Sequence, residues 1–415
     1  MKVCMICPEI GDSRRNAFIG GHVNNVIQLS KDLSARGHEI TIITTPHRFP
    51  GNNLINNPIS EYADVVTLPV RGTFSSFNYG FDFVIKSIKK VHELNKEKKF
   101  DIIHGHSGYT MLALLTSICA KISDLPSVHT IYCPIQVENG SFVKLFSNQF
   151  LSSLYLSRVN KVIAVTKNIK QSLISVGVAE KKIAEIPIGI DPLRYNPRVF
   201  GNNVKNDWGI SHDENVLIFV GNSTNQKGIL LLIESLNYIK CTFPKIKLFM
   251  ALNMPIERYN SPGRLDSDMS QIFRIKDKIK LYNLEKNVIP LGLLENMPEY
   301  LAASDIFIAP FLNTVGIADH PTSMLEAMAI GRPVIATDVG GISELLSDSG
   351  AGILIKPNDI SELTSAIYHL LSNRDLAKNM GKNGENMIVR SFRSDKVISL
   401  IESLYEEVIS NYNRN

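Results

Sequence analysis

Short apolar, strand-like runs alternate with helix-like segments along the whole chain, and they fall into two series. The first series begins at residues 2–7 and the second at residues 216–221. Such alternation is typical of parallel α/β proteins, in which each helix returns the chain to the start of the next parallel strand. The sequence therefore predicts an α/β fold with two parallel sheets in tandem.

The opening segments show this pattern clearly. The apolar run 2–7 leads into a loop that ends in Gly20-Gly21, and residues 22–36 carry apolar side chains at helical spacing. Gly37 suits the end of that helix, and 39–44 is the next expected strand. The other expected strands are 65–68, 101–104, 127–130, 161–165 and 183–186 in the first series, and 216–221, 247–252, 288–291, 306–309, 333–337 and 352–355 in the second.

Residues 189–215, between the two series, are rich in Pro, Asn, Gly and Asp and show no periodicity, which is typical of an interdomain linker. We therefore predict an N-terminal domain over 1–195, a C-terminal domain over 196–392, and a last helical segment, 393–415, that packs back on the N-terminal domain. Parallel sheets bind ligands beyond the carboxyl ends of their strands, so the expected site is the cleft between the domains.

Composition excludes several classes of protein. The 415 residues include 44 Lys+Arg and 40 Asp+Glu, so the net charge of +4 does not favour a nucleic-acid partner. The longest apolar stretch, 109–120, is shorter than the roughly 18 residues that a membrane-spanning helix needs, and no signal peptide is recognisable, which favours a cytoplasmic protein. Cys4 and Cys7 lie within the first expected strand, where we interpret them as buried structural residues.

The stretch 305–344 carries the most chemical information. Its pattern predicts a strand, a loop, a helix that begins near Thr322 or Ser323, and a further strand. A helix N-terminus offers free backbone N–H groups and a positive dipole end, which suit a diphosphate. Glu326 lies near this end, where its carboxylate could accept two hydroxyls of a ribose; the alternative is a capping carboxylate that only complements the helix dipole.

The order and spacing of these motifs resemble glycosyltransferase family 4, a class of retaining enzymes with the GT-B fold. The resemblance runs nearly end to end and rests on Gly20-Gly21, Leu29-Ser-Lys-Asp-Leu-Ser-Ala-Arg-Gly37, Ile188-Gly-Ile-Asp191, Phe219-Val-Gly221, Lys227-Gly228 and the 305–344 block. It implies two Rossmann-like domains with sheets facing across a cleft. It also implies transfer of a sugar, with retention of configuration and without a metal or cofactor, from a nucleotide-sugar donor to a hydroxyl of a sugar, lipid-linked or small-molecule acceptor. UDP is the nucleotide expected from the family.

The resemblance assigns donor-binding roles in the C-terminal domain. Lys227 matches the lysine that binds the diphosphate and stabilises charge on the leaving group. Glu326 matches the second glutamate of the family's E-x7-E pattern, which binds the ribose. Ser323, Met324 and Leu325 are expected to present backbone N–H groups to the phosphates.

In the N-terminal domain, the resemblance assigns His129 to the family's active-site histidine, at the end of a strand and in contact with the transferred sugar. Gly21 is expected to approach the diphosphate or the acceptor closely because it has no side chain. His22, His106 and Thr130 are further candidates on the acceptor side. For such a histidine, the alternative is a purely structural hydrogen-bonding role.

Two positions depart from the family pattern. Asn222 stands where an arginine is usual after Phe-Val-Gly, and an asparagine amide can replace only one hydrogen bond and none of the charge. Ala318 stands at the first glutamate of E-x7-E, and Asp319, one residue later, could supply catalytic contacts with donor hydroxyls instead. These departures keep open an alternative, a nucleotide-sugar-binding relative with little or no transferase activity; phosphorylase and epimerase chemistry on the same fold are less favoured.

Asp266-Ser-Asp268 matches the D-x-D motif that binds a divalent metal in unrelated glycosyltransferases. It follows a polar stretch with Pro262 and Gly263 instead of a strand, so we interpret it as a solvated turn and expect no metal site.

The segment 85–100 contains six lysines and follows a stretch with five aromatic residues, 74–83. A basic helix beside aromatic side chains could rest on an anionic membrane and receive a lipid-linked acceptor, with Phe142, Leu145, Phe146 and Phe150 as an added apolar surface. A solvated helix face with ordinary core aromatics is the favoured alternative.

Overall fold

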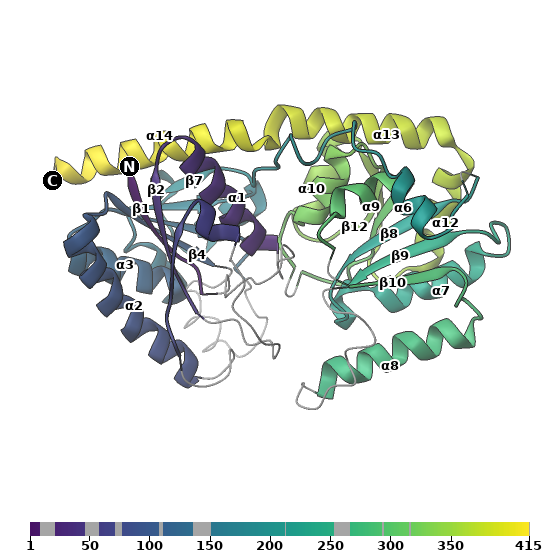
Figure 1. Cartoon of the computed structure of the whole chain (residues 1–415), viewed down its shortest axis with the longest axis horizontal. Coiled ribbons are helices and arrows are strands. Elements are labelled where there is room, and N and C mark those ends of the chain that lie inside the picture. The colour runs from purple at the N-terminus through teal and green to yellow at the C-terminus, as the bar shows by residue number, and fades with distance from the viewer. Residues whose placement is uncertain are drawn as a thin grey trace. The chain divides into compact units, whose positions relative to one another are not determined.

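The computed structural model describes residues 1–8, 21–45, 58–70, 77–107, 111–135, 151–211, 213–252, 266–292, 294–314 and 317–414. The chain forms two compact units (Figure 1). The first unit comprises Met1–Gly189 and Ser394–Asn415, and the second comprises Ile190–Arg393. The first boundary therefore lies between Gly189 and Ile190, whereas the sequence pattern placed it after residue 195.

The first unit contains a parallel sheet of seven described strands in the order β3-β2-β1-β4-β5-β6-β7. Its strands are β1 (Lys2–Ile6), β2 (Glu39–Thr44), β3 (Asp64–Thr67), β4 (Ile102–Ser107), β5 (Ser127–Ile131), β6 (Lys161–Ala164) and β7 (Ile183–Glu185). In the register of the sheet centre, Val3 of β1 pairs with Ile40 on one side and with Ile102 on the other. The strands match those expected from the sequence, with ends that differ by at most three residues.

Helices cover both faces of this sheet. They are α1 (Gly21–Ala35), α2 (Phe77–Lys98), α3 (Met111–Ser123), α5 (Lys167–Ser175) and α14 (Ser394–Asn413), with short 3-10 turns at Pro58–Glu61 and Glu180–Lys182. Alternate side chains of a strand point to opposite faces. Val3 and Met5 accordingly pack toward α1 and α14, and Cys4 and Ile6 pack toward α2 and α3.

The last helix, α14, belongs to the first unit, and Figure 1 shows it in yellow along that unit's sheet. Its inner face is buried on the sheet through residues such as Ile401 and Tyr405. On its outer side, Glu402 accepts hydrogen bonds from Arg36 Nη1 at 2.5 Å and His38 Nε2 at 2.8 Å, which tie it to the end of α1. These contacts give the helix an apolar and an ionic attachment to the first unit.

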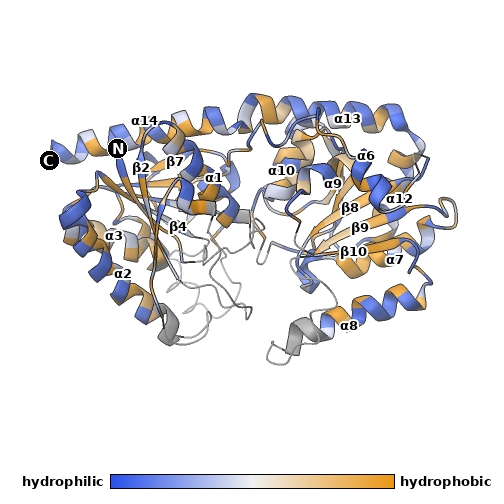
Figure 2. Cartoon of the chain, viewed as in Figure 1, coloured by the Kyte–Doolittle hydropathy of each residue, from blue (hydrophilic) through white to orange (hydrophobic). Residues whose placement is uncertain are grey.

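The second unit contains a parallel sheet of six described strands in the order β10-β9-β8-β11-β12-β13. Its strands are β8 (Val216–Gly221), β9 (Lys247–Leu252), β10 (Val288–Leu291), β11 (Ile306–Ala309), β12 (Val334–Thr337) and β13 (Gly352–Ile355). Its helices are α6 (Asn202–Asp207), α7 (Ile229–Ile239), α8 (Asp266–Leu281), α9 (Met297–Ala303), α10 (Thr322–Ala329), α11 (Ile342–Ser349), α12 (Ile360–Ser372) and α13 (Arg374–Met387), with a 3-10 turn, η3 (Asn225–Lys227), and a π-helical turn, η5 (Ile388–Phe392). The apolar strands and the inner faces of the helices are orange in Figure 2.

Residues 190–215 are a packed part of the second unit, so the interpretation of the stretch 189–215 as a linker was wrong. It contains α6, and the side chains of Val204 and Ile210 are buried. A side chain at Gly201 would place its Cβ 2.2 Å from the backbone nitrogen of Ala303, so this segment lies directly against the end of α9. Its buried apolar residues are too few and too widely spaced to show a period in the sequence.

Within the described part of the chain, none of the helices is both long and apolar enough to cross a membrane.

Candidate functional site

In the second unit, the loop after β8 holds Lys227 in a fixed place. Gly228, at the start of α7, has a φ of +70°, and a Cβ there would lie 1.7 Å from the carbonyl oxygen of Pro310. Only glycine fits this position, because it tolerates positive φ and adds no side chain. Nζ of Lys227 lies 4.5 Å from the centroid of the Phe311 ring, in the loop after β11. The lysine is thus positioned at the carboxyl ends of two neighbouring strands.

The side chain of Asn222 is oriented by its own loop. Its Oδ1 accepts hydrogen bonds from the backbone N–H of Thr224 at 3.2 Å and from the Thr224 hydroxyl at 2.6 Å. Because the oxygen is used in this turn, the amide group of Asn222 is the part that can donate to a ligand. The sequence assigned one such hydrogen bond to this asparagine.

Helix α10 begins after Pro321. Two of the three backbone N–H groups predicted to bind phosphate are used in its first turn. The backbone N–H groups of Met324 and Leu325 donate to the carbonyl of Pro321 at 3.0 and 3.2 Å. They therefore take part in the first turn of the helix, and their side chains are fully buried. Ser323 is the remaining candidate of the three, since it lies closer to the open end of the helix.

Glu326 is buried, and its partner is Tyr195. The Tyr195 hydroxyl donates a hydrogen bond to the Glu326 carboxylate, and no side chain caps α10 at Pro321. Burial raises the pKa of Glu326 to about 7, and the Tyr195 hydrogen bond and the nearby Arg194 charge oppose that rise. Glu326 is therefore a buried polar group hydrogen-bonded to Tyr195, and not the capping carboxylate of the alternative interpretation.

Asp319 and His320 hold the turn before α11. Oδ1 of Asp319 accepts a hydrogen bond from the backbone N–H of Gly341 at 2.7 Å, and Nε2 of His320 donates to the Gly341 carbonyl at 3.1 Å. A Cβ at Gly340 or Gly341 would lie within 2.8 Å of the Asp319 carboxylate. Asp319 is 4% exposed, so this carboxylate is committed to the turn, which differs from the catalytic contact with the donor predicted from its place near Ala318.

In the first unit, His129 lies in the middle of β5 instead of at its end, and the structure corrects its predicted role. Its side chain is fully buried, with Nδ1 3.0 Å from the Thr116 hydroxyl and Nε2 3.3 Å from the Ser107 hydroxyl. A Cβ at the neighbouring Gly105 would lie 2.3 Å from Nδ1. Burial lowers the pKa of His129 to about 3. This neutral, enclosed imidazole packs against α3 and has no exposed face for a sugar.

On the opposite face of the sheet, two acceptor-side candidates, His106 and His22, lie beside Tyr132, which follows β5. Nδ1 of His106 lies 3.1 Å from the Tyr132 hydroxyl, and the ring of His22 in α1 has its centroid 5.8 Å from that of Tyr132. Burial, followed by the neighbouring histidines, holds the pKa of His106 well below its usual value. Gly21, the first residue of α1, precedes His22.

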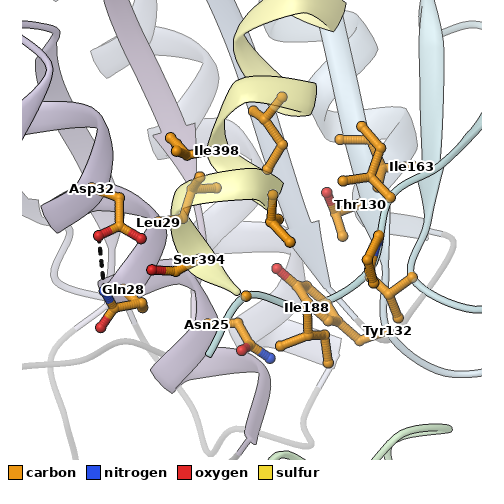
Figure 3. A pocket seen from close by; sticks show the side chains of 16 residues that line it. Asn25, Gln28, Leu29, Asp32, Thr130, Tyr132, Ile163, Ile188, Ser394 and Ile398 are labelled. Atoms are coloured by element: carbon orange, nitrogen blue, oxygen red, sulfur yellow. Dashed lines mark hydrogen bonds between the residues drawn. The ribbon is translucent and has the colours of Figure 1, made fainter. Parts of the chain in front are cut away.

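Thr130 is used differently. Its hydroxyl is hydrogen-bonded to Nε2 of His104 at 2.7 Å, and Nδ1 of His104 is bonded to the Tyr405 hydroxyl of α14 at 2.6 Å. Thr130 and Tyr132 line a pocket of about 40 Å³. Figure 3 shows their side chains together with that of Asn25 from α1. Thr130 therefore connects the sheet to α14, and Tyr132 lies closer to the two histidines.

Tyr132 and Tyr195 are not among the residues that the sequence predicts for the site. Tyr132 is the first residue after the strand Ser127–Ile131, which is the position that parallel sheets use for ligands. Tyr195 follows the Ile188-Gly-Ile-Asp191 motif by four residues, but nothing in the sequence pairs it with Glu326.

Among the residues that the structure describes, no group of three or more His, Cys, Asp and Glu side chains is arranged to hold a metal ion. Asp266 and Asp268 fall in the first turn of α8.

The basic helix predicted at 85–100 corresponds to the later part of α2, which ends at Lys98. Two apolar residues of α2 face solvent. Phe81 is 58% exposed and Ile85 is 50% exposed, one helical turn apart, whereas Phe83 is buried in the core. Lys86 is paired with Asp82 at 2.9 Å. The aromatic residues Phe142, Phe146 and Phe150, with Leu145, lie outside the described residues, as does Phe74.

Two family models match the chain in succession. The model described as Glycosyltransferase Family 4 matches residues 19–194, and the model described as Glycosyl transferases group 1 matches residues 202–387. Together they extend over most of both units.

Two similar proteins match most of the chain. N-acetyl-alpha-D-glucosaminyl L-malate synthase of Bacillus anthracis is 26% identical over 99% of this chain and 97% of its own length. UDP-Gal:alpha-D-GlcNAc-diphosphoundecaprenol alpha-1,3-galactosyltransferase of Escherichia coli is 27% identical over 79% of this chain and 80% of its own length.

Two solved structures show the shared fold. Sucrose-phosphate synthase of Thermosynechococcus elongatus has a TM-score of 0.81 with 21% identity and covers 99% of both chains. Anabaena HepE in complex with UDP-glucose has a TM-score of 0.75 with 17% identity, over 98% of this chain and all of the other. The predicted GT-B fold, with two Rossmann-like domains, is confirmed by these likenesses.

Proposed function

Because the chain belongs to glycosyltransferase family 4 and is a glycosyltransferase, we propose that it transfers a sugar from a UDP-sugar to an acceptor hydroxyl and retains the anomeric configuration. The donor binds to the second unit, at the carboxyl ends of β8 and β11. The acceptor binds to the first unit near the ends of β4 and β5.

The observation that carries this proposal is the fixed position of Lys227 over Phe311. Departure of a nucleoside diphosphate places growing negative charge on the leaving oxygen, and a cation already in place stabilises it without reorganisation. Asn222 adds a hydrogen bond from its amide, and Ser323 adds a backbone N–H at the positive end of α10. Lys227 therefore supplies the charge that an arginine at position 222 would otherwise share.

Glu326 fits the ribose of the same nucleotide. An ionised carboxylate accepts several hydrogen bonds, so Glu326 can bind two ribose hydroxyls while Tyr195 occupies one of its remaining lone pairs. With protein groups in place for both ribose and diphosphate, the proposed reaction needs no metal ion or cofactor.

We assign the acceptor side to the half-buried His22, and we propose that the buried Tyr132 and His106 position it. Their side chains lie close together near the carboxyl ends of β4 and β5 and the start of α1 at Gly21. None of the three is a carboxylate, the usual nucleophile in a covalent sugar intermediate. We therefore propose displacement on the same face of the sugar, in which the leaving phosphate helps to deprotonate the acceptor hydroxyl.

The acceptor is a small molecule, a glycan or a lipid-linked sugar. The name of the B. anthracis relative specifies L-malate, and that of the E. coli relative specifies a diphosphoundecaprenol-linked sugar. The exposed Phe81 and Ile85 on the lysine-rich helix α2 favour peripheral association with an anionic membrane, where a lipid-linked acceptor would be found.

Product analysis tests this function. The purified protein is incubated in EDTA with UDP-glucose, UDP-galactose or UDP-N-acetylglucosamine and with acceptors of the three classes, and UDP release and the anomeric proton of the product are followed by NMR. Acceptor-dependent UDP release with an anomeric coupling like that of the donor supports a retaining transferase. An inverted product, or nucleotide binding without turnover for every acceptor, contradicts the proposal.

A further inference from the structure

The motif Ile188-Gly-Ile-Asp191 forms a structured turn at the start of the second unit. Oδ1 of Asp191 accepts hydrogen bonds from the backbone N–H groups of Leu193 at 2.8 Å and Arg194 at 3.3 Å. The backbone carbonyl of Asp191 accepts a third from the N–H of Tyr195 at 2.9 Å. Asp191 therefore fixes the backbone from which the side chain of Tyr195 projects.

Tyr195 is buried, and its hydroxyl reaches the carboxylate of Glu326 in α10. Arg194 is fixed beside this pair, because its Nη2 donates to the carbonyl of Glu295 at 3.1 Å and its guanidinium lies 5.4 Å from the centre of the Tyr195 ring. Among the described residues, Tyr195 and Arg194 are the groups that lower the pKa of Glu326 against the effect of burial.

A buried carboxylate needs such a partner to bind a sugar well. Only the ionised form offers hydrogen-bond acceptors at both oxygens, and burial alone favours the protonated form, which replaces one acceptor with a donor. A hydroxyl that donates to the carboxylate favours its charged form and fixes its rotation.

We propose that Tyr195 is a positioning residue for donor binding: its hydroxyl aligns the Glu326 carboxylate so that the remaining lone pairs meet the ribose hydroxyls of the nucleotide. The inference rests on the proposed binding of the donor ribose by Glu326. It gives the turn at Asp191 a function, because this turn connects the first residues of the second unit to the nucleotide site.

Tyr195→Phe tests the proposal, since it removes only the hydroxyl and keeps the ring beside Arg194. UDP affinity is measured by calorimetry between pH 5.5 and 9. Wild-type affinity is expected to fall on acidification with a midpoint near pH 7, the pKa of Glu326. In Y195F the dissociation constant at pH 7 rises about tenfold, and the midpoint moves upward by about one pH unit, as expected for loss of a hydrogen bond to a charged group.

Tyr238→Phe is the matched control, because Tyr238 is 57% exposed on α7 and the same atom is removed there. It should keep the wild-type affinity and midpoint. Glu326→Gln should weaken binding and abolish the pH step, and adding Y195F to E326Q should change affinity by less than about twofold, since the hydroxyl acts through the carboxylate.

Unchanged affinity and midpoint in Y195F overturn the inference while wild-type UDP binding still supports the proposed function. A weaker affinity without a midpoint shift also overturns it, because loss of packing alone does not move a titration. If the wild-type protein binds no nucleotide at any pH, the proposed function fails and the inference fails with it.

Discussion

Nζ of Lys227 lies 4.5 Å from the centroid of the Phe311 ring, so the loop after β8 and the loop after β11 meet at a cation–aromatic contact. A backbone hydrogen bond from Leu312 N–H to the carbonyl of Gln226, at 2.9 Å, joins the same two loops. An ammonium group held over an aromatic face loses little further freedom when an anion binds. The charge that we propose to bind the diphosphate is thus held in place by the second unit itself.

Lys227→Gln should reduce kcat/KM with the UDP-sugar about 100-fold, because it removes a positive charge aimed at the leaving group. The glutamine side chain keeps a similar length. Steady-state kinetics measure the effect. Lys245→Gln is the control, since Lys245 is an exposed surface lysine paired with Asp213. Similar kinetics for the two variants would exclude Lys227 from the transfer step.

Gly228→Ala should destabilise the second unit and displace Lys227. The added methyl group would lie 1.7 Å from the Pro310 carbonyl oxygen at a φ of +70°. Gly209→Ala is a matched control, because Gly209 also has positive φ, +61°, but no atom lies within 4 Å of the added Cβ. G209A should cost only about 1 kcal/mol of unfolding free energy, whereas G228A should cost at least about 3 kcal/mol.

Urea unfolding followed by tryptophan fluorescence measures both variants. The chain has one tryptophan, Trp208, in the second unit, so the signal reports on that unit. Equal losses of unfolding free energy in the two variants would show that the loop after β11 moves to accommodate the methyl group. That result would contradict a fixed position for the Lys227 loop.

Glu326→Gln should stabilise the second unit relative to wild type more strongly at pH 8 than at pH 5. The folded-state pKa of Glu326 is raised from 4.5 to about 7, so its contribution to stability is present below pH 4.5 and is lost as the pH rises through 7. Glutamine does not ionise, so the difference in unfolding free energy between E326Q and wild type should grow by about 2.5 kcal/mol from pH 5 to 8. Parallel pH profiles in urea unfolding would contradict the buried position of this carboxylate.

The double variant Phe81→Ser with Ile85→Ser should lose binding to vesicles that contain anionic lipid, because it removes the two exposed apolar side chains of α2. Vesicle co-sedimentation at low and high salt measures this effect. Phe273→Ser is the control, since Phe273 is equally exposed but lies on α8 of the second unit. Equal vesicle binding by wild type and both variants would exclude α2 as a membrane-binding face.

Most of the fold could be predicted from the sequence because parallel strands buried on both faces appear as short, nearly continuous apolar runs. The runs 216–221 and 247–252 match β8 and β9 to the residue. The position of Lys227 was predictable for a related reason: Gly228 marks the turn between strand and helix.

Side-chain direction was much harder to predict. His129 lies on the face of β5 that packs against α3, and a shift of one residue along a strand exchanges the two faces. The partners of the Met324 and Leu325 N–H groups depend on where α10 starts. A shift of two residues decides whether an N–H donates to a ligand or to a carbonyl of the helix. The contact between Tyr195 and Glu326 joins residues far apart in the chain, which no local pattern specifies.

We propose that the second unit binds a nucleoside diphosphate through Lys227 and Glu326 without a metal. A thermal-shift panel of UDP, GDP, ADP and their common sugar conjugates, with and without EDTA, tests it most directly. A nucleotide at 100 times its dissociation constant should add about 2.7 kcal/mol of stability. We expect UDP and UDP-sugars to raise the melting temperature equally with and without EDTA. Loss of the shift in EDTA, or no shift with any nucleotide, would contradict the claim.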